Sequence, residues 1–264
     1  MLILKIIFRR IGVNALFHNG GKVMTGYFDT HCHILPGVDD GANDIVDTRR
    51  MLLTSYEEGI RIITATPHYI AGKSNTPVNQ LKAIFEEVKL VAEEVTVGMQ
   101  IILGNELFYN LGLIDALKKG DALTIDETRY ILVEFLPSAS YHEIRVGLNH
   151  CIFAGYIPIL AHVERYQCLI KDYILVGELI KLGAYIQINF SGVIGSIIDP
   201  KVKFCHKLLK NEWVHFLGTD AHGSIERVPR ARAAVRVLRK KYGEYKVRQL
   251  LWDNPMTMLE DKHL

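Results

Sequence analysis

The sequence predicts an α/β protein built as a single distorted, TIM-like barrel of seven β/α units. Short apolar runs rich in β-branched residues alternate with amphipathic helical stretches at intervals of about 30 residues, which is typical of parallel βαβ units. No linker or low-complexity segment interrupts this alternation between residues 27 and 222. One closed or nearly closed barrel therefore fits the 264 residues better than two small domains.

Seven apolar runs are the candidate strands. In order along the chain they are Tyr27–Ile34, Ile60–Thr66, Gln100–Leu107, Tyr130–Phe135, Ile157–His162, Ala184–Phe190 and Val214–Thr219. The clearest helix between them is Val78–Val95, which has a continuous apolar face. That face consists of Leu81, Ile84, Phe85, Val88 and Val91. A glycine precedes three of the strands where a left-handed helix cap is expected, at Gly59, Gly155 and Gly183.

The first 23 residues differ from the rest and are interpreted as an N-terminal extension. Their apolar run MLILKIIF is interrupted by Lys5 and followed by Arg9 and Arg10, so it fits neither a secretory signal nor a membrane span of about 20 apolar residues. Met24 is the hypothesised natural start, and residues 24–264 are the predicted domain. A short amphipathic segment on a membrane surface is the alternative for the extension.

Composition places the chain among ordinary globular enzymes. Apolar residues make up 49% and charged residues 23%, which excludes a disordered chain, and the net charge of +2 gives no reason to expect a nucleic-acid partner. Four scattered cysteines without a C-x-x-C pair exclude a disulfide scaffold and a thiolate zinc site. We expect a cytoplasmic protein without a transmembrane segment.

One stretch near the C-terminus is locally basic. Residues 230–248 contain eight Lys or Arg against a single acidic residue, Glu244. Their spacing predicts an outer helix with a solvated charged face, and contact with an anionic partner or a bilayer surface is the alternative.

Nitrogen and oxygen ligands end six of the seven candidate strands. They are His31, His33, His68, Glu106, Glu134, His162, Asp220 and His222. The spacing of two places His31 and His33 on one face, with Cys32 on the other. The C-terminal rim of a parallel barrel is where catalytic residues gather, and burying this many ionisable groups without a cation is very costly. The pattern therefore predicts a metal site.

Eight candidate ligands exceed the needs of one ion and predict two or three. Imidazole and carboxylate without sulfur suit manganese, iron or zinc, and magnesium less well. Such a cluster lowers the pKa of bound water towards neutrality and attracts an anionic substrate. Arg165, three residues past His162, is the candidate that clamps phosphate oxygens, and Arg227 is a second substrate-binding candidate. An ion pair between Arg165 and Glu164 is the alternative.

With these residues in place, the chain resembles the PHP (polymerase and histidinol phosphatase) superfamily. Within it, the chain is most similar to the manganese-dependent protein-tyrosine phosphatases of bacterial capsule and exopolysaccharide loci. The stretch HILPGVDDGA is the specific part of the match. The matching segments are FDTHCHILPGVDDG (28–41), ATPHY (65–69), GNE (104–106), LVEF (132–135), AHVERY (161–166) and GTDAH (218–222).

The resemblance implies a distorted seven-stranded β/α barrel with a trinuclear metal site, most simply of Mn²⁺. Carried over residue by residue, it makes the eight strand-end residues the metal ligands and Arg165 the catalytic, phosphate-binding arginine. It places Asp40 near the cluster as an acid or orienting group, while Asp39 is interpreted as a turn residue only. Asn105 departs from the small apolar residue common in the family, and residues 1–23 have no counterpart.

The implied reaction is hydrolysis of protein phosphotyrosine, without a phosphocysteine because no C-x5-R motif is present. The implied partner is a membrane-associated bacterial tyrosine autokinase that controls capsule or exopolysaccharide synthesis, which allows a peripheral position at the inner face of the membrane. Three alternatives stay open: a PHP phosphatase of a small metabolite such as histidinol phosphate, an amidohydrolase-type metal hydrolase, and a non-enzymatic metal-binding subunit. The oligomeric state, a homo-oligomer included, also stays open.

Overall fold

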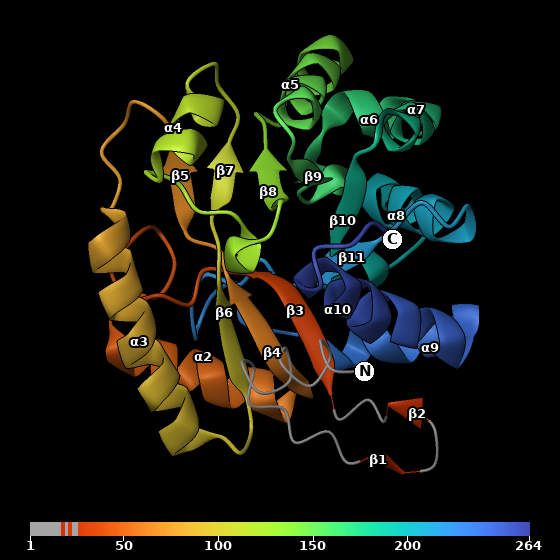
Figure 1. Ribbon diagram of the computed structural model, residues 1–264. Helices are drawn as coiled ribbons and strands as arrows, with labels where there is room; N and C mark the ends of the chain where they lie inside the picture. Colours follow the sequence, from red (N-terminus) through yellow and green to blue (C-terminus); the bar gives the residue numbers. More distant parts are fainter. Residues whose placement is uncertain (1–16, 19–20, 23–25) are drawn as a thin grey trace.

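The computed structural model describes residues 17–18, 21–22 and 26–264, with the strands at the centre and the helices around them (Figure 1). The hypothesised start at Met24 and the run MLILKIIF lie outside the described residues. The strands are β1 Phe17–His18, β2 Gly21–Lys22, β3 Tyr27–Cys32, β4 Ile60–Ala65, β5 His68–Ile70, β6 Gln100–Leu103, β7 Glu106–Phe108, β8 Tyr130–Glu134, β9 Ile157–Leu160, β10 Tyr185–Asn189 and β11 Phe216–Gly218.

Helices separate most of the strands along the chain, although β5 follows β4 directly and β7 follows β6 directly. They are α2 Ile45–Glu57, α3 Val78–Val95, α4 Leu113–Lys119, α5 Tyr141–Phe153, α6 Gln167–Lys171, α7 Ile174–Leu182, α8 Pro200–Lys210, α9 Arg232–Arg248 and α10 Asn254–Leu259, with the short turns η1 Ile125–Glu127, η2 Val163–Arg165, η3 Phe190–Val193 and η4 Gln249–Asp253. Across residues 17–18, 21–22 and 26–264, none of the helices has the length and apolar character needed to span a bilayer.

The predicted elements are found in the predicted order. A parallel strand lies within each of the seven candidate runs, and α3 has the predicted bounds, with Leu81, Val88 and Val91 buried. Gly59, Gly155 and Gly183 have φ values of 91°, 92° and 113°, which is the left-handed conformation expected of helix caps.

The predicted closed barrel is not confirmed, because strands β3 to β11 form two separate parallel sheets, and β1 and β2 form an antiparallel pair of their own. One has the order β11-β10-β9-β8-β7-β5 and the other the order β3-β4-β6. The chain leaves β4 at Thr66 and re-enters the neighbouring sheet as β5 at His68. Pro67 between them has no N–H to donate, which interrupts the ladder at this point. On the other side β11 lies next to β3, and the ladder between them is limited to an isolated parallel bridge between Cys32 and Ala221.

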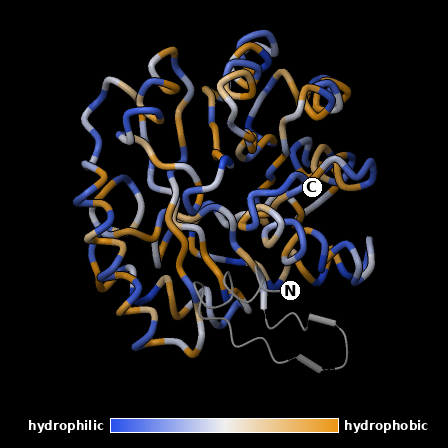
Figure 2. The backbone as a smooth tube through the Cα atoms, viewed as in Figure 1, coloured by the Kyte–Doolittle hydropathy of each residue, from blue (hydrophilic) through white to orange (hydrophobic). Residues whose placement is uncertain are grey.

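The apolar core has two parts, and together they leave one end of the strands free for polar side chains. An inner cluster fills the space at the strand starts, where η4 and α10 close it from below. Its members include Phe28, Ile62, Tyr130, Ile157, Phe216, Trp252 and Met256. A second, larger cluster lies between the strands and the surrounding helices, whose ribbons alternate hydrophobic and hydrophilic colours in Figure 2. The interior at the C-terminal strand ends is left to polar side chains.

Candidate metal centre

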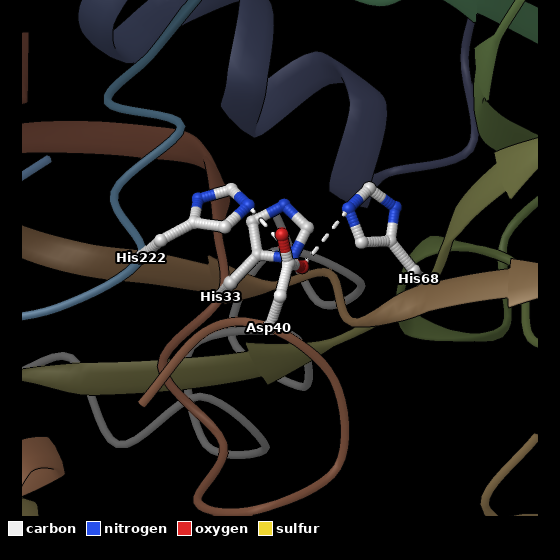
Figure 3. Close-up of side chains that lie close together, drawn as sticks. All are labelled: His33, Asp40, His68 and His222. Carbon is white, nitrogen blue, oxygen red and sulfur yellow. Dashed lines mark ion pairs between the residues drawn. The ribbon is translucent and has the colours of Figure 1, made fainter. Parts of the chain in front are cut away.

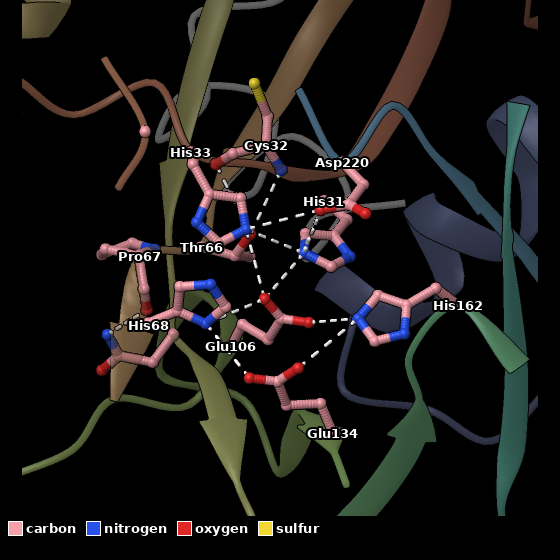
Figure 4. A network of polar contacts seen from close by, with 12 residues as sticks. His31, Cys32, His33, Thr66, Pro67, His68, Glu106, Glu134, His162 and Asp220 are labelled. Atoms are coloured by element: carbon pink, nitrogen blue, oxygen red, sulfur yellow. Dashed lines mark hydrogen bonds and ion pairs between the residues drawn. The ribbon is translucent and has the colours of Figure 1, made fainter. Parts of the chain in front are cut away.

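All eight strand-end residues predicted as ligands converge on one point at the C-terminal rim. Six come from the end of a strand or from the loop directly after it: His31 and His33 from β3, Glu134 from β8, His162 from β9, and Asp220 and His222 from β11. His68 and Glu106 follow the ends of β4 and β6 by three residues and are the first residues of β5 and β7. Figure 4 shows the side chains of seven of them directed towards one another.

The two first histidines come from one face at the end of β3. His31 and His33 are two residues apart and face the site, as predicted, whereas Cys32 between them packs into the outer apolar cluster. The pairing of β3 with β4 is irregular between Asp29 and Cys32. Gly218 on β11 permits this approach, because a Cβ atom there would lie 2.5 Å from the Cβ of His31.

Glu106 lies at the centre of the cluster and is fully buried. Its Oε2 atom is 3.1 Å from Nε2 of His31, 3.2 Å from Nε2 of His33 and 3.2 Å from Nδ1 of His68. Its Oε1 atom accepts a hydrogen bond of 2.6 Å from Nε2 of His162. One carboxylate thus contacts four imidazoles, which is the position of a bridging ligand.

The donor set fits metal ions. The described residues form four overlapping groups whose ligand atoms lie within 4.8 Å of one another. These groups are His33–Asp40–His68–His222, His31–His33–Asp220, His31–Glu106–His162 and His68–Glu106–Glu134. Among the described residues, the buried Oε2 of Glu106 has no hydrogen-bond donor despite its close neighbours. Buried polar atoms are normally paired, so this unpaired oxygen supports a cation as the missing partner.

The pKa shifts of the buried groups favour negatively charged carboxylates, which suit the binding of a cation. Burial raises the pKa of a carboxyl, but the charges of His31 and His162 lower the pKa of Glu106 well below its usual value. For Asp220, burial is likewise outweighed by the same two histidines, and its pKa falls to about 2. Burial opposes protonation of His33, yet its contact with Asp39 and the nearby charge of Glu106 raise its pKa to about 10. The carboxylates of Glu106 and Asp220 are therefore charged, and in the absence of a metal ion the negative charge favours the protonated form of His33.

Asp40 lies at the open side of the cluster, as the resemblance implied. Its Oδ1 is 3.4 Å from Nε2 of His68 and 3.6 Å from Nε2 of His222, and its side chain is 67% exposed. Figure 3 shows Asp40 between the two imidazoles, next to His33. This carboxylate is therefore able to meet a substrate as well as an ion.

The two predicted arginines meet on Asp220. Nη1 of Arg165 is 3.7 Å from Oδ2 of Asp220, and Nη2 of Arg227 is 2.8 Å from Oδ1. The alternative partner of Arg165, Glu164, is buried and instead accepts a 2.7 Å hydrogen bond from the backbone N–H of Asn189. Two guanidinium groups thus stand at the edge of the metal centre, where an anion would be held.

Asp39 has a role that the sequence interpretation missed. It does form the predicted turn, accepting a hydrogen bond from Gly41 N, but its Oδ2 is also 2.7 Å from Nδ1 of His33 and accepts from His68 N. A carboxylate on the far nitrogen orients a ligating imidazole and makes it more basic. The interpretation of Asp39 as a turn residue only is therefore wrong. The signal available was an acidic residue in the loop directly after His-x-His.

Other orienting groups come from distant parts of the chain. Asn189, at the end of the one strand that supplies no predicted ligand, donates a 2.9 Å hydrogen bond to Asp220. Asp29 accepts hydrogen bonds from the backbone and hydroxyl of Thr219, which fixes the loop that carries Asp220. His162 and Asp220 themselves have φ values of 31° and 51°, unusual for residues other than glycine. Such conformations cluster at functional sites.

Comparison with known proteins agrees with this geometry. The family model described as "Capsular polysaccharide synthesis, CpsB/CapC" matches residues 27–260. The chain belongs to the CpsB/CapC family. It is 34% identical over 239 residues to the tyrosine-protein phosphatase CpsB of Streptococcus pneumoniae, covering 89% of this chain and 98% of that protein. It is 32% identical over 237 residues to the tyrosine-protein phosphatase YwqE of Bacillus subtilis (strain 168), covering 89% and 92%.

Solved structures of CpsB/CapC proteins share the fold. Crystal structures are known of YwqE from B. subtilis and CpsB from S. pneumoniae, which are described as unique metal-dependent tyrosine phosphatases. One of these structures is similar to this chain with a TM-score of 0.81 at 28% identity, and the similarity covers 90% of this chain and 96% of that chain. A histidinol phosphate phosphatase from Lactococcus lactis subsp. lactis Il1403 has a TM-score of 0.56 at 15% identity over 81% of this chain and 92% of that one, which shows likeness of fold alone. The resemblance found in the sequence is confirmed.

Proposed function

We propose that the protein is a metal-dependent phosphatase that hydrolyses phosphotyrosine on proteins. The observation that carries this proposal is the rim cluster itself, in which Glu106 and seven other imidazole and carboxylate side chains gather and two arginines stand beside Asp220. The described CpsB and YwqE proteins support phosphotyrosine as the substrate class. The phosphatase domain spans residues 24–264 in this proposal.

The four ligand groups would hold two or three Mn²⁺ ions, with Glu106 shared between neighbouring groups. When bound, such ions activate water as a nucleophile and neutralise charge on the phosphoryl group. Fe, Zn and Mg are the other candidates. Asp39 holds the imidazole of His33 so that its Nε2 faces the cluster.

The residues at the cluster's edge would bind the phosphoryl group of the substrate and protonate the leaving group. Arg165 and Arg227 each present N–H donors that suit two oxygens of one phosphoryl group. The phenolate that leaves has a pKa near 10, so it needs little acid assistance, and the exposed Asp40 is placed to supply a proton. The three buried cysteines Cys32, Cys151 and Cys205 have a raised thiol pKa because of burial, which argues against a thiolate nucleophile.

Phosphate release from a phosphotyrosyl peptide tests the proposal. Manganese-loaded protein should release phosphate, and protein treated with chelator should release none until Mn²⁺ is restored. Turnover that survives complete removal of metal would contradict a metal-dependent reaction. Loaded protein that ignores the peptide but cleaves histidinol phosphate would instead favour a phosphatase of small metabolites.

We also propose that the protein substrate is a membrane-associated tyrosine kinase, met through basic helices beside the site. Within the stretch 230–248, Arg232, Arg239 and Arg248 are bonded to Glu57, Glu244 and Asp253. The exposed Arg236 and Lys240 have no ion-pair partner among the described residues. Lys241 of α9 is 3.3 Å from His206 of α8, and α8 carries four exposed lysines. Those are Lys201, Lys203, Lys207 and Lys210.

This basic surface, formed by α8 and α9, should attract an anionic phosphorylated tail or the inner face of a membrane. We expect the double substitution Arg236→Glu and Lys240→Glu to lower kcat/KM for a phosphorylated kinase tail and to leave p-nitrophenyl phosphate unaffected. The loss should shrink as salt rises, because exposed charges are screened. Equal rates on the tail for variant and unsubstituted protein would refute the proposal.

A further inference from the structure

A cleft opens directly beside the candidate metal centre. Its volume is about 730 Å3, and its walls are the first turns of α2 and the loop from His222 to Arg227. Asp40 and His222 line the cleft and also belong to one ligand group of the cluster. The cleft is therefore continuous with the site of the chemistry and is not a separate surface feature.

One wall is a single face of α2. Val46, Asp47 and Arg50 follow one another at helical spacing and line the cleft, whereas Met51 and Leu52 on the opposite face are fully buried in the core. The helix is thus anchored by packing behind the cleft. Substitutions on its exposed face should leave the fold intact.

The opposite wall is held in place by the same helix. Oδ1 of Asp47 accepts a hydrogen bond from the backbone N–H of Ser224, and its Oδ2 accepts one from Asn43. His222 N donates to the carbonyl of Arg227, which closes the loop on itself. The cleft is therefore already shaped before a ligand arrives.

The cleft is lined by exposed apolar side chains, by Arg50 and Arg227, and by the carboxylates of Asp40, Asp44, Asp47 and Glu226. Asp44 and Asp47 accept hydrogen bonds from backbone N–H groups, and Asp40 lies against the imidazoles of the cluster. Val46 is 51% exposed and Ile225 is 86% exposed. Arg50 has no ion-pair partner among the residues that the structure describes. α2 begins at Ile45 and rises about 1.5 Å per residue, so Arg50 lies about 7.5 Å along the helix from its first residue. An extended chain covers that distance in about two residues, counted from the substrate residue that adjoins the phosphotyrosine.

We propose that this cleft binds the polypeptide that flanks the phosphotyrosine, in an extended conformation. An apolar side chain of the substrate lies between Val46 and Ile225, and an acidic side chain about three residues from the phosphotyrosine pairs with Arg50. The inference rests on the proposed function and adds a sequence preference to it. A small phosphate ester reaches the metal centre without filling the cleft.

Steady-state kinetics on two substrates tests the inference. The substrates are p-nitrophenyl phosphate and phosphotyrosyl peptides with Glu or Gln three residues before or after the phosphotyrosine. Arg50→Glu should lower kcat/KM about fivefold for one of the two Glu peptides, the size of effect that a partly exposed ion pair supports, and should not change the Gln peptides. Ile225→Asp should lower kcat/KM about tenfold for all peptides. Neither variant should affect p-nitrophenyl phosphate.

Two matched variants control for surface charge. Lys119→Glu reverses an exposed charge at the end of α4, and Val97→Asp replaces a side chain that is 82% exposed in the turn before β6. Both should behave like the unsubstituted protein. Equal losses for control and cleft variants, no preference between Glu and Gln peptides, or losses that extend to p-nitrophenyl phosphate would each overturn the inference. Protein that cleaves p-nitrophenyl phosphate but no phosphotyrosyl peptide would refute the proposed function instead.

Discussion

Replacing Glu106 by Gln is expected to remove metal from the protein and to abolish its phosphatase activity. Glu106 is buried and contacts four imidazoles through its two oxygens, so it is the carboxylate shared by the ligand groups. Gln has nearly the same shape but carries no charge and presents an N–H₂ group to the cluster. Loss of an outer partner of a metal ligand already costs about 10- to 100-fold in affinity, so loss of a shared ligand should cost more.

Metal content by elemental analysis and Mn²⁺ affinity by calorimetry measure this effect directly. Glu164→Gln is the matched control, since Glu164 is a buried carboxylate on the same rim that belongs to none of the ligand groups. It should retain metal. A circular dichroism spectrum identical to that of the unsubstituted protein shows that Glu106→Gln has folded. A folded Glu106→Gln variant with unchanged metal content would contradict the assignment of Glu106 as a ligand.

Replacing Arg165 by Ala is expected to reduce kcat by about 10²- to 10³-fold, the cost of removing one donor that stabilises charge developing in a transition state. Arg165 is 39% exposed, and its contact with Asp220 is loose at 3.7 Å. Its N–H groups are therefore available to a phosphoryl group. Arg227 is committed more closely, with bonds of 2.8 Å and 3.2 Å to the carboxylate and carbonyl of Asp220. Arg227→Ala should therefore have the smaller effect on kcat.

Three measurements separate catalysis by Arg165 from a structural role. Arg165→Lys should recover part of the lost rate, because it restores charge but not the two-pronged geometry. The Mn²⁺ content of Arg165→Ala should equal that of the unsubstituted protein, and inorganic phosphate should inhibit it less. A variant that loses metal together with activity would show that Arg165 supports the cluster and does not act on the substrate.

Much of the fold was predictable because local patterns report it. A strand occurs within each of the seven apolar runs, and α3 has the bounds that its apolar periodicity indicated. The candidate ligands were predictable for the same reason. Parallel strands bring their C-terminal ends together, so a residue at the end of an apolar run is expected on the rim. His68 and Glu106 reach it just after β4 and β6 end, although they begin the next strands, β5 and β7.

Closure of the sheet was not predictable in this way. The break between β4 and β5 depends on how Pro67 meets its neighbours across the strands. The ladder between β3 and β11 is limited to one bridge, between Cys32 and Ala221, although the two strands lie next to each other. The apolar pattern of each strand would be the same in a closed barrel. Pairing between strands more than 180 residues apart is decided by packing, not by either strand alone.

The sequence by itself determined the alternation of strands and helices, the strand ends, and hence the set of residues that meet there. Only the tertiary structure decided which of them touch: that Glu106 is central, that Asp39 orients His33, and that Arg165 turns to Asp220 instead of Glu164. The physical reason is the distance along the chain over which each property is determined. Periodicity and chain direction are local properties, whereas a contact between side chains depends on the relative placement of segments that only the packed core brings together.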